Sequence, residues 1–204
     1  MTKMSKYLAS AAMVAALALP GAASALTFTG SWAIGAINSI DPGLVVKTSS
    51  SGGGFSTDLG VGDSHTFNLF RIWTDETSVN VPEDTAPKPF SVAFSFDDPV
   101  TGGTATGVTY GTNNFWTQSG VLAWDGPITL SFGQNNTGKL SLALSDAVFN
   151  AGLFGLKEGW KHGDKVTATL TYDTAPIPLP ATLPLLLGGL ALAAAARRRA
   201  TLRA

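Results

Sequence analysis

The sequence predicts an all-β fold: an antiparallel two-sheet β-sandwich, jelly-roll-like, with one apolar helix before it and one after it. Several segments alternate large apolar with small polar residues at a period of two, which is the pattern of half-buried strands. Clusters of Gly, Pro, Asn and Asp separate these segments and indicate turns. The chain has no cysteine, so its middle part depends on an apolar core, and about 150 residues are enough to form one.

The alternation is clearest from Phe90 to Phe96, where it places Phe90, Val92, Phe94 and Phe96 on one buried face. Three further segments repeat it with Ser and Thr on the outer face: 128–132, 140–144 and 166–172. Weaker strand candidates are 26–34, 44–48, 65–73, 104–110 and 121–124. The regular spacing of short strands and turns favours a sandwich over a barrel.

The segments between these strands are expected to be turns and loops. Turn residues cluster at 41–43, 51–54, 97–99, 101–103, 125–127 and 134–138. We expect Gly52-Gly53-Gly54 to be a flexible loop tip and 79–89 to be a long exposed loop. Only Asp146–Leu156 could form a helical turn, which its two glycines would weaken.

Residues 1–25 have the features of a signal peptide. Lys3 and Lys6 precede the apolar run Leu8–Leu19, which is too short to span a membrane. Ala23 and Ala25 then form the small-x-small pattern of a signal peptidase site. We therefore expect passage through the export translocon, cleavage after Ala25, and a folded domain at 26–175.

Residues 176–204 combine a short motif, an apolar segment and a basic end. The motif is Ile177-Pro178-Leu179-Pro180-Ala181. The uncharged segment Leu183–Ala196 would reach only about 21 Å as a helix, against about 30 Å for a hydrocarbon core, so it is a marginal transmembrane anchor. The basic end is Arg197, Arg198 and Arg199. The positive-inside bias keeps these arginines cytoplasmic and places the body on the outer, periplasmic side.

The order of motif, apolar helix and arginine cluster resembles the PEP-CTERM class of bacterial sorting signals, in particular its VPLPA variant. Ile177 replaces the Val of that variant, and five residues follow the arginines. The resemblance implies an exosortase-type membrane enzyme as partner, processing near Pro180, and transient anchoring in the inner membrane. The processed protein would then reach the cell surface or the exopolysaccharide matrix of a Gram-negative bacterium. An ordinary tail anchor with a proline-rich linker is the alternative.

The body is acidic, with seven Lys and Arg against 14 Asp and Glu, a formal charge of −7. Nucleic-acid binding relies on clustered basic residues, so we expect no nucleic-acid partner. The same charge disfavours anionic lipid surfaces. Lys157, Lys161 and Lys165 do cluster, but Glu158 and Asp164 lie among them, as in an ordinary solvated stretch.

No motif indicates catalysis, a cofactor or a metal site, so the sequence predicts none of these. His65 and His162 are far apart in sequence, and we expect both at the surface. Acidic pairs in turns are expected to be solvated, with a calcium-binding loop as the alternative. A weak extracellular hydrolase would need paired carboxylates across a cleft. Its obvious candidates are Asp97, Asp98 and Glu158.

Among the five tryptophans, Trp116 is the best candidate for contact with a glycan. It lies in Asn113–Gln118, which combines two aromatic residues with amides. The simpler expectation is that Trp116 packs beneath its own loop. The sequence therefore predicts an exported, non-catalytic envelope or extracellular-matrix protein, with a glycan-binding module for exopolysaccharide and a weak extracellular hydrolase as alternatives.

Overall fold

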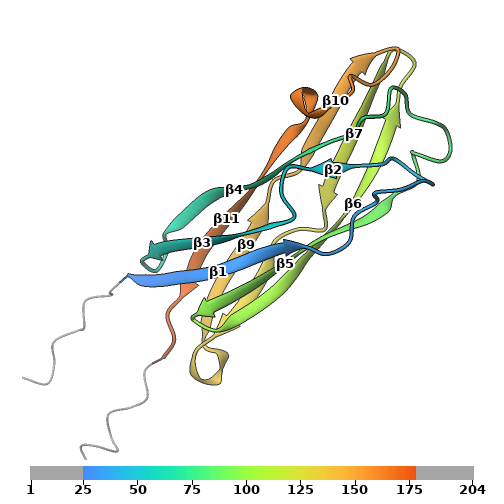
Figure 1. Cartoon of the computed structure of the whole chain (residues 1–204). Helices are drawn as coiled ribbons and strands as arrows, with labels where there is room; N and C mark the ends of the chain where they lie inside the picture. The colour runs from blue at the N-terminus through green and yellow to red at the C-terminus, as the bar shows by residue number, and fades with distance from the viewer. Residues whose placement is uncertain (1–24, 178–204) are drawn as a thin grey trace, which may run out of the picture.

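The computed structural model describes residues 25–177 (Figure 1). Several expected features lie outside the described residues: the signal helix with Ala23, the motif from Pro178 to Ala181, the apolar tail helix, and Arg197, Arg198 and Arg199. Within 25–177, no helix is long and apolar enough to cross a membrane.

The predicted all-β class is confirmed: the described residues form two antiparallel sheets. The six-stranded sheet has the order β10-β7-β6-β5-β1-β3, with strands Ala147–Leu153, Thr117–Trp124, Thr101–Asn113, Lys88–Asp98, Leu26–Ile34 and Gly52–Leu59. The five-stranded sheet has the order β2-β4-β11-β9-β8, with strands Lys47–Thr48, Ser64–Trp73, Asp164–Thr174, Gly138–Leu144 and Ile128–Phe132. Two 3-10 turns complete the elements, η2 at Gln134–Asn136 and η3 at Trp160–His162.

The apolar core lies between the two sheets. Phe28 of β1 packs edge-on against Phe132 of β8 and Tyr172 of β11, with ring centroids 5.7 and 5.1 Å away. The Trp32 and Phe70 rings pack at a tilt of 43°, with centroids 5.8 Å apart. The four residues predicted to face inward from 90–96 are indeed buried, because alternate side chains of a strand share one face.

The loop expected at Gly52–Gly54 is wrong, because these glycines open β3. Gly52 and Gly53 pair with Ala33 and Trp32 of β1. A Cβ atom on Gly53 would lie 3.2 Å from Nε1 of Trp32, so the missing side chain makes room for the indole. The turn expected at 101–103 is wrong for a similar reason, since its glycines belong to β6 and pair with Phe94 and Ser95 of β5.

The segment 146–156, the one place where the sequence allowed a helical turn, contains a strand instead. Residues 147–153 form β10, which pairs with β7. Ala147 and Phe149 are buried, whereas Val148 between them is 59% exposed, so the period is two. Pairing with β7 outweighs the weak helical preference of this segment.

Residues 79–87 form a loop, as predicted, but Lys88 and Pro89 begin β5, and the predicted exposure is wrong at two positions of the loop. Val79 and Asp84 are buried, with only 4% and 1% of their surfaces exposed. The Asp84 carboxylate accepts a hydrogen bond from the Asn80 amide at 2.7 Å, and the Gly111 amide donates to the Asp84 carbonyl at 2.7 Å. These bonds hold residues 74–84, called here the 74–84 loop, against the sheet.

The molecule is elongated, and its two ends differ in what they carry (Figure 1). Ala25 and Ile177, where the described chain begins and ends, lie at one end. The opposite end carries the turn between β6 and β7, the end of β10 and the 74–84 loop. Strand β6 alone has 13 residues and so spans about 43 Å.

Candidate binding site at the aromatic apex

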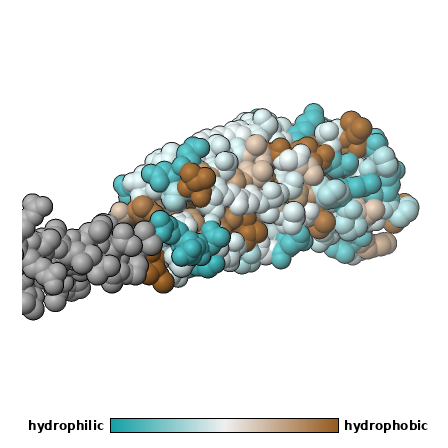
Figure 2. Space-filling model, turned by 90° about the horizontal axis from the view of Figure 1, so that it is seen from below, coloured by the Kyte–Doolittle hydropathy of each residue, from teal (hydrophilic) through white to brown (hydrophobic). Residues whose placement is uncertain are grey.

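Four large apolar side chains project into solvent at the end of the molecule opposite to Ala25 and Ile177. We call them the aromatic apex: Phe115, Trp116, Leu153 and Phe154, which are 84, 60, 72 and 72% exposed. Figure 2 shows hydrophobic side chains at this end of the molecule. Exposed apolar residues that gather in one place indicate an interaction surface, whereas single ones do not.

The apex joins two segments that are distant in sequence. Phe115 and Trp116 lie between β6 and β7, and Leu153 and Phe154 lie at the end of β10. The Trp116 ring meets Phe115 at 4.7 Å and Phe154 at 5.4 Å between centroids, both nearly edge-to-face. The Phe154 amide also donates to the Trp116 carbonyl at 3.1 Å.

Local backbone geometry explains why these side chains point outward. Asn114 and Thr117 exchange two backbone hydrogen bonds, at 2.9 and 3.2 Å, and so leave Phe115 and Trp116 as the two central residues of a tight turn. Phe154 has a φ of +60°, in the left-handed region that bulky residues rarely adopt. Such local strain persists where the surrounding structure enforces it, and it is frequent at functional sites.

Asn150 fixes the second segment of the apex. Its side chain is buried, and its oxygen accepts a hydrogen bond from the Thr74 amide at 2.9 Å. Its amide group donates to the carbonyls of Thr74, Lys157 and Gly159. A single buried side chain therefore ties β10 to the 74–84 loop and to the segment before η3.

The expectation that Trp116 packs beneath its own loop is wrong, because its side chain is 60% exposed. The neighbouring residues Gln118 and Asn113 bond to the 74–84 loop. Gln118 accepts a hydrogen bond from the Val79 amide at 2.7 Å, and Asn113 donates to the Val79 carbonyl at 3.2 Å. The Val79 backbone thus bonds to residues on both sides of the turn, and Trp116 stays 60% exposed. Two of the amides that the sequence groups with Trp116 hold the 74–84 loop.

Leu153 and Phe154 are functional candidates that the sequence analysis missed. The expected helical turn at 146–156 concealed them, although the alternation from Ala147 to Phe149 is a signal that could have revealed a strand. Trp160 is also 59% exposed, and the Arg71 guanidinium lies 5.6 Å from its ring centroid, a cation–π contact outside the apex.

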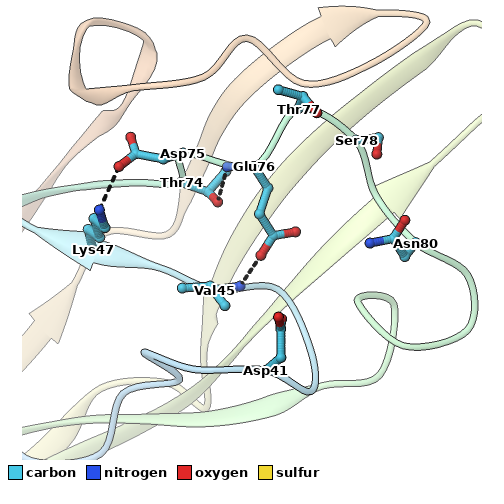
Figure 3. Close-up of a pocket in the computed structure, with 9 residues that line it drawn as sticks. All are labelled: Asp41, Val45, Lys47, Thr74, Asp75, Glu76, Thr77, Ser78 and Asn80. Carbon is cyan, nitrogen blue, oxygen red and sulfur yellow. Dashed lines mark hydrogen bonds and ion pairs between the residues drawn. The ribbon is translucent and has the colours of Figure 1, made fainter.

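Beside the apex, an acidic pocket of about 450 Å³ opens at the 74–84 loop (Figure 3). It is lined by Asp41, Val45, Lys47, Thr74, Asp75, Glu76, Thr77, Ser78 and Asn80. The Val45 amide donates to the Glu76 carboxyl at 2.6 Å, and Lys47 pairs with Asp75 at 2.6 Å. Figure 3 shows the Glu76 side chain pointing from its loop toward Val45 and Asp41.

The Glu76 carboxyl holds its proton unusually firmly. Burial raises its pKa from the ordinary 4.5 to about 7, although the Val45 hydrogen bond acts in the opposite direction. The Asp84 and Asp41 carboxylates raise the pKa further. The group therefore changes charge near neutral pH.

The hydrolase and metal-ligand candidates considered from the sequence lie at the surface. Asp97, Asp98 and Glu158 are exposed, and none of them lines the acidic pocket. Both histidines are exposed. Among residues 25–177, no three His, Asp or Glu side chains are grouped so that they could hold a metal ion.

Of the expected sorting motif, the structure describes Ile177 alone. Its side chain is 67% exposed, and its amide donates to the Thr137 hydroxyl at 3.0 Å. Comparison with protein-family models, curated proteins and solved structures gives no match to this chain. Its function therefore has to be inferred from its own residues.

Proposed function

We propose that this protein is an exported, non-catalytic envelope or extracellular-matrix protein that an exosortase-type membrane enzyme sorts and processes. The observation that carries the proposal is the order of motif, apolar segment and arginines at 176–204, together with the signal-peptide pattern at 1–25. The tail holds the protein transiently in the inner membrane, with a jelly-roll-like sandwich on the periplasmic side. Processing then releases it to the cell surface.

The geometry of the described residues supports this route. Ala25 and Ile177, which adjoin the proposed cleavage sites in sequence, lie together at the end opposite to the apex (Figure 1). Ile177 is exposed, which suits attack by an enzyme a few residues further on. Removal of both ends would leave the two sheets and their shared core unchanged.

A processing experiment tests the proposal. Native cells would express the protein with an epitope inserted in the exposed turn at Gly62, and membrane and extracellular fractions would be compared by immunoblot. We expect the Pro178→Ala/Pro180→Ala double variant to accumulate uncleaved in the membrane. The conservative variant Ile177→Val should be processed like the wild type. Equal release of the double variant would contradict the proposal.

A second candidate function, binding of exopolysaccharide at the apex, is favoured by the exposure of Trp116. An aromatic ring stacks on the apolar face of a sugar, and Trp116 has two aromatic neighbours. Residues 107–123 contain no charged side chain, which suits a neutral polymer. The Trp116→Ala variant should lose retention on purified matrix polysaccharide without a change in melting temperature, whereas Trp160→Ala should bind normally. Equal retention of Trp116→Ala and the wild type would contradict this function.

A further inference from the structure

The 74–84 loop contacts both segments of the aromatic apex. On the side of β10, the Leu156 amide donates to the Thr77 carbonyl at 2.8 Å. On the side of β7, the Val79 amide donates to Gln118 at 2.7 Å. Any change in the position of this loop therefore acts on both segments at once.

Glu76 lies in this loop among charged groups from two parts of the chain. Asp84 comes from the same loop, and Asp41 comes from the segment before β2. Lys47 and Asp75 line the same pocket but pair with each other at 2.6 Å. The charged groups that act on Glu76 are therefore the Asp84 and Asp41 carboxylates, and both oppose its ionisation.

We infer that the protonation state of Glu76 controls how firmly the 74–84 loop holds the aromatic apex. When Glu76 is neutral, it still accepts the Val45 hydrogen bond and adds no negative charge beside Asp84 and Asp41. When it is ionised, it faces Asp84 and Asp41 as a third negative charge in a half-buried site, and the loop loosens. The apex is then more ordered in mildly acidic medium than in alkaline medium.

This inference deepens the candidate function of the apex, since it assigns a regulation to that same surface. The coupling itself needs no ligand, so it can be measured without one. If pH changes the order of the apex but polysaccharide retention is absent, the binding function fails and the coupling stands. If the protein is retained on polysaccharide equally at every pH and the Trp116 environment does not change with pH, the coupling fails and the binding function stands.

The experiment follows the Trp116 environment as the pH changes. The full-length chain in detergent micelles, labelled with 5-fluorotryptophan, gives one fluorine NMR signal for each of its five tryptophans. The Trp116→Phe variant assigns the signal of interest. We expect this signal to shift with a midpoint near pH 7, while the signal of buried Trp32 stays constant.

Two variants test the role of Glu76. In Glu76→Gln, the amide oxygen can accept from Val45 and the side chain is uncharged at every pH, so the Trp116 signal should no longer titrate. In Asp84→Asn, the loss of a neighbouring negative charge should move the midpoint to lower pH. His162→Gln, which replaces an exposed side chain of η3, serves as a control and should leave the titration unchanged.

A Trp116 signal that stays constant between pH 5 and pH 8.5 in the folded wild type would overturn the inference. An unchanged titration in Glu76→Gln would overturn it equally. The Trp32 signal shows in each case whether the variant is folded.

Discussion

Gln118 of β7 accepts a hydrogen bond from the backbone amide of Val79 at 2.7 Å, and this bond seats the 74–84 loop beneath the turn that carries Trp116. Val79 is almost fully buried, so its amide has no ready access to water. The Gln118 side chain therefore links the aromatic apex to the loop that carries Glu76.

Gln118→Leu should destabilise the protein. The change leaves the buried Val79 amide without an acceptor, which costs about 1–3 kcal/mol. Urea unfolding measures the loss. Gln134→Leu, at an exposed position in η2, is the matched control and should stay within about 0.5 kcal/mol of the wild type. Equal stability of the two variants would show that the bond to Val79 contributes nothing.

Asn150→Asp should be more harmful than a typical surface change. An aspartate keeps the oxygen that accepts from Thr74 but lacks the amide that donates to three carbonyls. A buried negative charge would then face those carbonyl oxygens, and we expect a loss above about 3 kcal/mol in urea unfolding.

The matched control for Asn150→Asp is Asp146→Asn, which makes the reverse chemical change at an exposed position. The new side chain keeps the oxygen that accepts a hydrogen bond from the Trp124 amide at 2.9 Å, so the effect on stability should be small. A mild effect of Asn150→Asp, similar to that of the control, would contradict the assigned hydrogen bonds of Asn150.

Gly120→Ala should destabilise the protein through overpacking. A Cβ atom on Gly120 would overlap the ring of Phe149, which is fully buried in β10. Overpacking of this kind costs about 1–3 kcal/mol. Gly54→Ala is the matched control, since its Cβ atom would lie 3.6 Å from its nearest neighbour, the Gly30 carbonyl oxygen. Thermal unfolding should separate the two variants, and a larger loss for Gly54→Ala would be inconsistent with the packing of β10 on β7.

Stability should depend on pH through Glu76. Its pKa is about 7 in the folded chain, against an ordinary value of 4.5, so the folded state binds the proton more tightly. The resulting stabilisation is complete below about pH 4.5 and is lost as the pH rises to about 7. Urea unfolding at pH 5, 6, 7 and 8 should show this decline in the wild type and in the control Glu83→Gln. A Glu76→Gln variant with the same decline would refute the assignment.

The regular strands could be predicted because apolar side chains alternate with polar ones and so indicate which face is buried. The alternation at 90–96 identifies β5, and the bounds expected for 26–34 and 128–132 agree with β1 and β8. Glycine has no side chain and therefore shows no such alternation, so the sequence could not reveal that Gly52–Gly54 and Gly102 form strands. Their conformation depends on the neighbouring strands with which they pair.

The candidate site could be predicted only in part, because it is assembled by tertiary contacts. Trp116 stands out in the sequence, but the turn that carries it is held by hydrogen bonds of Gln118 and Asn113 with the distant Val79 backbone. Phe154 joins Trp116 only through the pairing of β10 with β7. The altered pKa of Glu76 likewise depends on a distant segment of the chain, which supplies the Val45 amide and the Asp41 carboxylate.

The central claim is that the chain is exported and trimmed at both ends, and mass spectrometry of the protein purified from native cells tests it most directly. We expect a mature N-terminus at Leu26 and a C-terminus near Pro180 or Ala181. A protein that retains Met1, or one that ends at Ala204, would contradict the proposed route.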